Sequence, residues 1–216
     1  MATERKNFFK DYKLFSACEK PESGLRERME RVYFHNGCAY ASDAHILVKV
    51  PLSYCTPFGA QDINALDGFC IHGKILKMIY SFDVVTIERT TTTEDAYGLQ
   101  LETPETAVYI KAVYQGEEVR FRLEKSDREF VSNFDRILAT ESGHRPLNKI
   151  GVDTGSLHRI SEALNMSSVL MNFTTAENKI FIRSVMEEDQ KSGPMAIILP
   201  IAVEPTLPGM GPEDAE

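Results

Sequence analysis

Asp43 and His45 form the first pair of residues in the chain whose types could carry out chemistry. A carboxylate and an imidazole two positions apart could act as an acid–base pair or as two ligands of a metal ion. Alternate residues of a strand share a face, so the two side chains could equally make a simple surface contact. No third ligand lies at a suitable spacing, and the other four histidines form no group. We therefore expect neither catalysis nor metal binding at this pair.

A second candidate is the run Asp153-Thr154-Gly155-Ser156, which follows apolar residues. The same four residue types surround the catalytic aspartate of aspartic proteases, in which two carboxylates share one proton and activate water. Such a site needs a second aspartate and a later apolar-apolar-glycine segment, but Ile197-Ile198 is followed by Leu199-Pro200. The residues after Ser156 have helical spacing, so Asp153 or Thr154 is better explained as a helix N-cap. A hydrolase that uses Asp153 stays as the enzyme alternative, and we predict that the protein is not an enzyme.

The composition of the chain narrows the possible classes of protein further. The chain has 216 residues, 43% hydrophobic and 26% charged, which is ordinary for a globular protein with a substantial core. Its net charge of −8 argues against a simple nucleic-acid coat, although a local cationic face would still be possible. No apolar run is long enough to cross a membrane and the first residues lack a signal sequence, so we expect a cytoplasmic protein. The four cysteines have no paired spacing and are expected to be reduced and buried, and no glycine-rich phosphate loop or other cofactor motif is present.

The elements that must position any site recur along the chain. A strand, a helix and three further strands are predicted twice. The predicted segments of the earlier copy are 68–72, 74–80, 84–89, 97–102 and 107–113; those of the later copy are 149–153, 157–164, 168–174, 179–185 and 194–201. The first fifty residues predict a third, degenerate copy: an amphipathic helix over 4–18 and strands over 31–34, 38–42 and 46–52. The Asn36-Gly37 pair between the first two of these strands is a strong hairpin signal.

The remaining segments are less regular. Residues 53–67 are expected to be a connection, 119–123 a strand, and 130–138 a helix because its apolar residues recur at helical spacing. Residues 119–145 could be a fourth, degraded copy or only a connector. Residues 204–216 contain three prolines and several acidic residues, and are expected to form a flexible acidic tail.

The order and chemistry of these segments resemble the DNA sliding clamp family, the ring-shaped processivity factors of replicative polymerases. Three stretches carry the resemblance. Residues 32–45 are similar to a clamp segment in which two strands flank a turn glycine and end in Ser42-Asp43-Ala44-His45. Residues 127–138 are similar to the stretch between successive bacterial clamp domains, although Val131 replaces the proline expected after Phe130. Residues 150–201 are similar to the last clamp repeat, which closes on an apolar strand interrupted by proline.

The resemblance implies an α+β fold of repeated β-α-β-β-β units, with antiparallel sheets outside and helices on one face. We expect two clamp-like domains, 1–115 and 116–203, which would match the two-domain subunits of trimeric clamps better than the six units of a bacterial subunit. In such a ring the helices line the hole and contact duplex DNA without reading its sequence. The cationic residues on the predicted helices, which would make these contacts, are Lys6, Lys10, Lys13, Lys74, Lys77, Arg136 and Arg159. Each could instead be an ordinary solvated charge on an amphipathic helix.

The resemblance also implies a site for short peptides of polymerases or clamp loaders, formed in part by the last strand. Leu199, Pro200 and Ile201 occupy the matching position, although they could simply end an edge strand, where proline is tolerated. The function expected is therefore a homo-oligomeric, non-enzymatic protein that tethers replication proteins to duplex DNA. The alternative is an adaptor or decoy that keeps the clamp fold and binds clamp partners without encircling DNA.

Overall fold

The protein is an α+β structure built on two antiparallel sheets, as seen in a computed structural model that describes residues 7–18, 27–55, 59–94, 100–114, 116–139, 150–173, 179–184 and 193–200. The larger sheet has eight strands in the order β8-β4-β1-β2-β3-β11-β10-β9. Their bounds are β1 Arg31–His35, β2 Cys38–Ser42, β3 Ile46–Pro51, β4 Phe69–His72, β8 Glu124–Lys125, β9 Val169–Phe173, β10 Ile180–Ser184 and β11 Met195–Ile198. The smaller sheet contains β5 Val84–Glu94, β6 Gln100–Tyr114 and β7 Glu117–Arg122.

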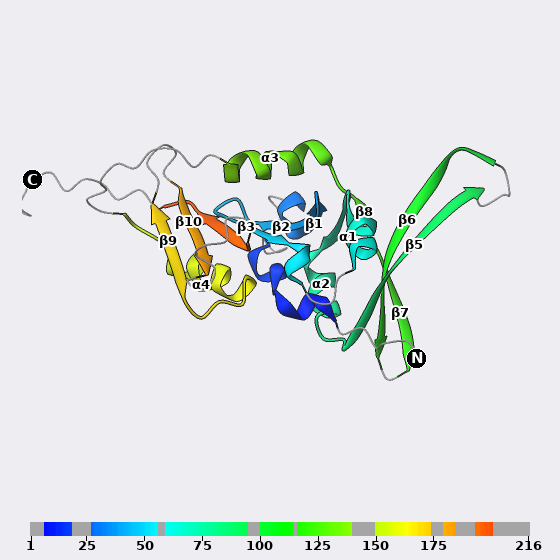
Figure 1. The fold of residues 1–216 in the computed structure, drawn as a ribbon, viewed down its shortest axis with the longest axis horizontal. Coiled ribbons are helices and arrows are strands. Elements are labelled where there is room, and N and C mark those ends of the chain that lie inside the picture. The colour runs from blue at the N-terminus through cyan, green and yellow to red at the C-terminus, as the bar shows by residue number, and fades with distance from the viewer. Residues whose placement is uncertain are drawn as a thin grey trace, which may run out of the picture.

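Helical elements cover both faces of the larger sheet (Figure 1). The helix α3 (Arg128–Ala139) lies on one face, and α2 (Gly73–Ile79) and α4 (Thr154–Ala163) lie on the other together with the N-terminal segment. That segment forms two short 3-10 helices, η1 (Phe8–Asp11) and η2 (Leu14–Ala17). The remaining helical elements in the described ranges are α1 (Ala60–Leu66), η4 (Glu27–Glu30) and η5 (Leu52–Tyr54). None of the helices in the described ranges is long and apolar enough to cross a membrane.

The central strands carry apolar side chains at successive positions, so both faces of the larger sheet are apolar and buried. In β1, Val32 and Phe34 belong to the core under α2 and α4, whereas Tyr33 belongs to the core under α3. In β10, Ile180 and Ile182 face the first core and Phe181 faces the second. Because successive strand residues point to opposite faces, an unbroken apolar run is what a strand covered on both faces requires.

Two three-stranded meanders meet at the centre of the larger sheet. The strands β1, β2 and β3 follow one another as antiparallel neighbours, and so do β9, β10 and β11. The last strand of each meander pairs with the other, antiparallel, with Val48 opposite Ala196 and Leu47 opposite Ile197. The helix α4 directly precedes the second meander, whereas η4 lies between η2 and the first meander. Both η2 and α4 lie on the same side of the sheet and pack against each other.

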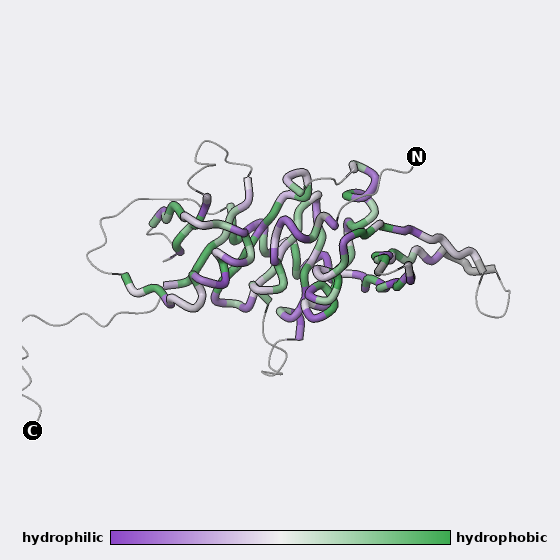
Figure 2. The backbone as a smooth tube through the Cα atoms, turned by 90° about the horizontal axis from the view of Figure 1, so that it is seen from below, coloured by the Kyte–Doolittle hydropathy of each residue, from purple (hydrophilic) through white to green (hydrophobic). Residues whose placement is uncertain are grey.

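The smaller sheet projects away from this body as a long hairpin (Figures 1 and 2). Its inner side near the body carries the buried Val85, Val108, Ile110 and Ala112, which join the core under α2. Its other side carries ion pairs, including that of Lys111 with Glu118. The sequence predicted separate strands over 97–102 and 107–113, but β6 runs unbroken from Gln100 to Tyr114.

Several other sequence predictions can be compared with this architecture. The hairpin at Asn36-Gly37 is confirmed: both residues have positive φ, 49° and 70°, and His35 pairs with Cys38. The continuous helix predicted over 4–18 is wrong for the residues that the structure describes, where two 3-10 segments are separated by the non-helical Tyr12 and Lys13. The strand predicted over 149–153 is reduced to a single bridge at Gly151, and Lys149 lies outside the described residues. The helix α1 lies within residues 53–67, where the sequence predicted only a connection.

The predicted division near residue 115 falls between β6 and β7, which are paired strands of one hairpin. Strands from both sides of that point also share the larger sheet, since β8 pairs with β4 and β11 pairs with β3. The predicted division therefore does not coincide with a break between sheets. The predicted tail, residues 204–216, lies outside the described residues.

Candidate anion-binding hollow on the helical face

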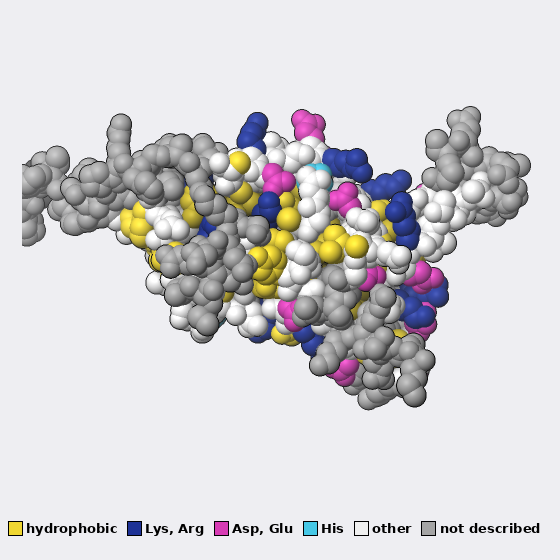
Figure 3. Space-filling model, in the orientation of Figure 1, with side chains coloured by type: hydrophobic (Ala, Val, Ile, Leu, Met, Phe, Trp, Pro, Cys, Tyr) yellow, Lys and Arg dark blue, Asp and Glu magenta, His cyan; other side chains and the backbone are white. Residues whose placement is uncertain are grey.

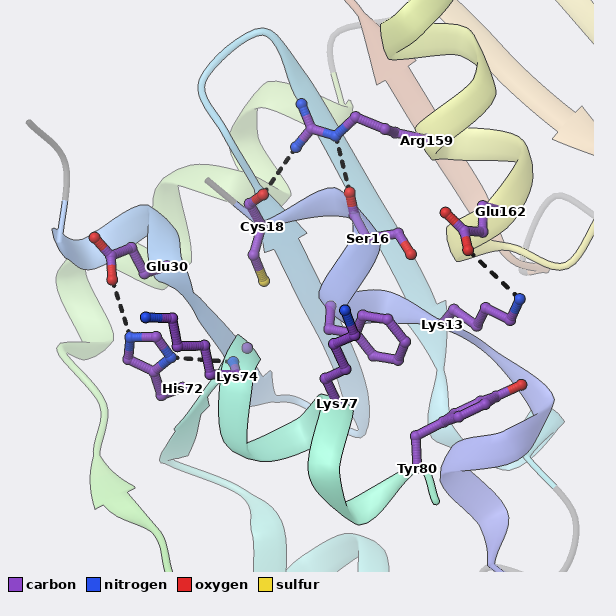
Figure 4. A pocket seen from close by; sticks show the side chains of 12 residues that line it. Lys13, Ser16, Cys18, Glu30, His72, Lys74, Lys77, Tyr80, Arg159 and Glu162 are labelled. Atoms are coloured by element: carbon purple, nitrogen blue, oxygen red, sulfur yellow. Dashed lines mark hydrogen bonds and ion pairs between the residues drawn. The ribbon is translucent and has the colours of Figure 1, made fainter. Parts of the chain in front are cut away.

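A hollow of about 690 Å³ opens between η2, α2 and α4 on the helical face (Figure 4). Its lining contains four cations, two carboxylates, one histidine and two aromatic rings among other side chains. The cations are Lys13, Lys74, Lys77 and Arg159. Four of the seven residues that the sequence singled out for contact with an anionic partner thus come together around one cavity.

Lys74 and Lys77 carry the positive charges of the hollow that no ion pair among the described residues neutralises. Both side chains are exposed on α2, three positions apart, and they share one face of that helix. No ion pair or side-chain hydrogen bond of either ammonium group occurs among the described residues. In Figure 4 both side chains rise from α2 at the hollow.

The helix α2 is fixed to the body at its first turn. His72 is its N-cap, and the Nδ1 atom accepts the Lys74 backbone N–H at 3.1 Å. Gly73 packs so closely that an added Cβ would lie 3.2 Å from the Glu30 carbonyl oxygen and 3.3 Å from Cys18 Sγ. The apolar side chains of Leu76 and Ile79 are buried on the inner side of the helix. This packing leaves the lysine side of α2 facing outward.

His72 also contacts a carboxylate at the edge of the hollow. Its Nε2 lies 2.9 Å from Glu30 Oε2, and the Glu30 side chain is nearly buried. Since Nδ1 accepts a backbone hydrogen bond, the neutral imidazole carries its proton on Nε2 and donates it to Glu30. His72 and Glu30 therefore form a hydrogen bond with each other, and neither of them forms an ion pair with Lys74 or Lys77.

Arg159 is held by three hydrogen bonds rather than directed at solvent. Its Nη1 bonds to Asp43 Oδ2, its Nε donates to the Ser16 carbonyl oxygen at 2.9 Å, and its Nη2 donates to the Cys18 carbonyl oxygen at 2.8 Å. Glu162, three residues further along α4, pairs with Lys13 and not with Arg159. We conclude that Arg159 joins α4 to the N-terminal segment and contributes only background charge to the hollow.

The lysines of the N-terminal segment are also paired. Lys10 contacts Asp83 at 2.7 Å, and Lys13 contacts Glu162 at 3.4 Å. The Lys13 ammonium group lies 6.0 Å from the centre of the Tyr80 ring, which fits a weak cation–π contact. Lys6 lies outside the described residues.

Arg136 does not join the others. It lies on α3, which covers the opposite face of the larger sheet from the hollow. Helical periodicity alone could not reveal this, because it gives the inner side of each helix but not the face of the sheet that the helix covers. On the side of the molecule drawn in Figure 3, basic side chains are interspersed with acidic ones.

The proposed peptide-binding residues lie at the end of β11. Leu199 is 42% exposed and its backbone N–H donates to the His45 carbonyl oxygen at 2.9 Å. Pro200 is half-buried, and Ile201 lies outside the described residues. The exposed Leu199 side chain is compatible with a small apolar contact.

The residues with possible catalytic chemistry serve local structure. Asp153 is the N-cap of α4, and its carboxylate accepts the Ser156 backbone N–H at 2.6 Å, which confirms the N-cap interpretation. Hydrogen bonds from the side chain and the backbone of Ser156 hold the pKa of Asp153 below its usual value. Asp43 accepts the backbone N–H groups of His45 and Ile46, each at 2.8 Å, and so closes the turn between β2 and β3. Within the described ranges no group of three potential ligands could hold a metal ion.

The cysteines are free, and Cys18, Cys55 and Cys70 are buried while Cys38 is partly exposed. Burial raises the pKa of the Cys18 thiol to about 12, so this thiol beside the hollow is not a nucleophile at neutral pH.

The residues of the hollow that the sequence patterns did not indicate include Tyr80, Phe15, His72 and Glu30. The spacing of Lys74, Lys77 and Tyr80, three residues apart, was the one signal in the sequence that could have indicated the aromatic ring. His72 directly precedes α2 as its N-cap, whereas Phe15 and Glu30 come from segments whose approach to α2 depends on tertiary packing.

Comparisons with known proteins give no independent assignment. No protein-family model matches the chain, and no curated protein matches it.

Proposed function

We propose that the protein is a non-enzymatic, sliding-clamp-like protein that contacts duplex DNA through its helical face and tethers partner proteins there. The observation that carries the proposal is the position of Lys74 and Lys77. Their ammonium groups are exposed, have no ion-pair partner among the residues that the structure describes, and lie on the same side of the sheet as η2 and α4. A clamp needs this combination of paired units and mobile phosphate contacts, because it must hold DNA without reading sequence.

The arrangement of the two meanders supports the clamp-like part of the proposal. A helical segment earlier in the chain than each meander, η2 for the first and α4 for the second, lies on the same face, and β3 and β11 pair antiparallel between the meanders. An antiparallel pairing of two equivalent last strands is what an approximate two-fold relation between the units would produce. The unit that contains α2 departs from this pattern, since β4 joins the larger sheet while β5, β6 and β7 form a sheet of their own.

A phosphate backbone can also recruit Lys13. Its contact with Glu162 is 3.4 Å long and both side chains are 36% exposed, so the ion pair contributes little stability. Exchange of this carboxylate for a DNA phosphate would therefore cost little. Lys10 pairs with a far more exposed partner, Asp83, and can be exchanged in the same way.

For the tether we propose the end of β11, where Leu199 and Pro200 would contact an apolar peptide from a polymerase or a clamp loader. The exposure of Leu199 is the supporting observation. The acidic balance of the chain, −8, would then lie mainly away from the helical face and discourage non-specific binding of DNA elsewhere.

Retention on circular DNA tests the encircling mechanism. The protein, with a clamp loader if one is required, should stay on a nicked circular duplex during gel filtration and leave it after a restriction enzyme linearises the circle. Lys74→Gln/Lys77→Gln should weaken retention, whereas Arg136→Gln, on the other face, should not. Equal loss from circular and linear DNA, together with a monomeric mass at high concentration, would contradict the ring.

The adaptor alternative is favoured by one observation, the neutralisation of Lys10, Lys13 and Arg159 by Asp83, Glu162 and Asp43. This pairing reduces the positive field of the helical face. Capture of polymerase or loader subunits by a protein with no measurable affinity for duplex DNA would establish the adaptor and exclude the DNA tether.

A further inference from the structure

The hollow has two features that contact with a duplex backbone does not require. It is concave, with a volume of about 690 Å³, and the aromatic side chains of Tyr80 and Phe15 line it. The outer surface of a duplex is convex and offers only phosphates and sugars to a helical face, so a cavity of this kind would stay empty. Cavities of a few hundred Å³ with apolar walls and a few polar groups are typical of sites for small ligands.

We propose that this hollow binds one unpaired nucleotide of a DNA strand, with its base against Tyr80 and its phosphate between Lys74 and Lys77. The choice of DNA rests on the proposed function, whereas the nucleotide chemistry rests on the hollow itself. Proteins that bind single strands without sequence preference combine a positively charged groove with aromatic side chains on which the bases stack.

The helix α2 arranges these three side chains in one stripe. Lys74, Lys77 and Tyr80 follow at intervals of three residues, and Tyr80 ends the helix with its N–H bonded to the Leu76 carbonyl oxygen at 2.9 Å. Residues three apart are neighbours on a helix surface, so the stripe runs from the cationic end of the hollow to its aromatic end. Figure 4 shows the two lysines and Tyr80 along the same helix at the edge of the cavity.

The ring of Tyr80 is held in place before any ligand binds. The Phe15 ring meets it edge to face, with centroids 5.5 Å apart and an interplanar angle of 75°. Lys13 lies 6.0 Å from the centre of the Tyr80 ring, so its charge is near a base stacked there. A fixed platform loses little conformational entropy when a base stacks on it.

The two carboxylates of the lining do not oppose a phosphate strongly. Glu30 accepts from His72 at 2.9 Å, and Glu162 is paired with Lys13 at 3.4 Å. Both carboxylates have lone pairs that could accept from the amino group of a base. Lys13 is matched by Glu162 and Arg159 by Asp43, so the two charges of Lys74 and Lys77 against that of Glu30 leave the cavity positive.

The test compares two fluorescent DNA probes of equal length and charge: a fully paired blunt duplex and the same duplex with a run of mismatched bases that stay unpaired. The wild-type protein should bind the partly unpaired probe more tightly, by about tenfold, because stacking on one aromatic ring contributes about that much. Tyr80→Leu keeps an apolar side chain but removes the platform, and should abolish the preference while binding the blunt duplex unchanged. The matched control is Tyr109→Leu on the projecting hairpin, which should keep the preference.

The possible results separate the nucleotide site from the duplex tether. Equal affinity of the wild-type protein for both probes overturns the nucleotide site and leaves duplex contact standing. Binding of a short oligothymidylate that depends on Tyr80, without any binding of the blunt duplex, supports the nucleotide site and overturns the duplex tether. A preference that survives Tyr80→Leu overturns the nucleotide site as well. Circular dichroism of each variant should show an unchanged fold, and Tyr80→Phe should restore the preference if Tyr80→Leu disturbs packing.

Discussion

Arg159 on α4 and Asp43 in the turn between β2 and β3 form an ion pair 2.5 Å long across 116 residues of sequence. The Asp43 residue is only 4% exposed, and the same carboxylate group closes the turn that β3 requires. The arginine also bonds to two carbonyl oxygens of the N-terminal segment. This pair therefore links the second meander, the first meander and the floor of the hollow.

Replacement of Arg159 by methionine should lower the free energy of unfolding by about 2–4 kcal/mol, because it leaves a buried carboxylate without its cation. Urea denaturation at neutral pH measures this change. The control is Lys10→Met, which breaks an exposed ion pair with Asp83 and should cost less than about 1 kcal/mol. If the two variants are equally stable, Arg159 does not link the two meanders.

The cationic contribution of α2 can be measured through salt. Each phosphate that the protein no longer neutralises should reduce the slope of log K against log salt by about 0.9, so Lys74→Gln/Lys77→Gln should reduce it by about two. Fluorescence anisotropy of a blunt duplex between about 50 and 200 mM salt gives the slope. Arg136→Gln, on α3, is the control on the opposite face of the sheet and should leave the slope unchanged. If Arg136→Gln reduced the slope by about 0.9, the phosphate contacts would not be confined to the helical face that carries α2.

The sequence was sufficient for features that depend on neighbouring residues. The Asn36-Gly37 turn, the strands of the two meanders and the Asp153 cap follow from local preferences, and the structure contains all of them. The sequence did not reveal that Arg159 would form an ion pair with Asp43, since their contact depends on the pairing of β3 with β11 and on the packing of α4. The side of the sheet that α3 covers was equally hidden, and with it the isolation of Arg136.

In the hollow, too, some residues could be placed from neighbouring positions in the sequence and others only from tertiary packing. Lys74 and Lys77 could be placed on one helix face from their spacing, but Phe15 and Glu30 come from other segments. Only tertiary packing brings those residues together with α2, so no local pattern could assign them. The predicted repeat over 68–113 is likewise divided between the sheets: β4 joins the larger sheet, whereas the long pairing of β5 with β6 satisfies the backbone groups of its later strands within a hairpin.

Asp135 should make stability depend on acid pH. Burial alone would raise the pKa of Asp135, but hydrogen bonds from Lys49 and Tyr40, at 2.7 and 2.6 Å, and the charge of Lys49 hold the pKa below the ordinary value of 3.8. A carboxyl whose pKa is lower in the folded state stabilises the fold above its unfolded pKa, and this stabilisation is lost as the pH falls through the folded value.

Asp135→Asn should therefore cost about 1–2 kcal/mol at neutral pH, and the difference from the wild type should shrink as the pH falls below about 4. Urea denaturation at several pH values measures both. Asp83→Asn, which alters an exposed carboxylate, should change the free energy of unfolding by less than about 1 kcal/mol. A constant difference for Asp135→Asn from neutral to acid pH would show that the carboxylate is not stabilised by Lys49 and Tyr40.

Gly37 should be intolerant of a side chain because of its backbone conformation. Its φ of +70° lies in the left-handed region, and a Cβ there would lie 3.7 Å from Ile63 Cγ2, an ordinary contact. Gly37→Ala should therefore cost about 1–2 kcal/mol through strain alone, without a clash. Thermal and urea denaturation measure the cost. Asn36→Gly, at the neighbouring position with φ of +49°, should be nearly neutral since glycine accepts that conformation. If Gly37→Ala were as stable as the wild type, the turn would have to relax, and the pairing of His35 with Cys38 would shift with it.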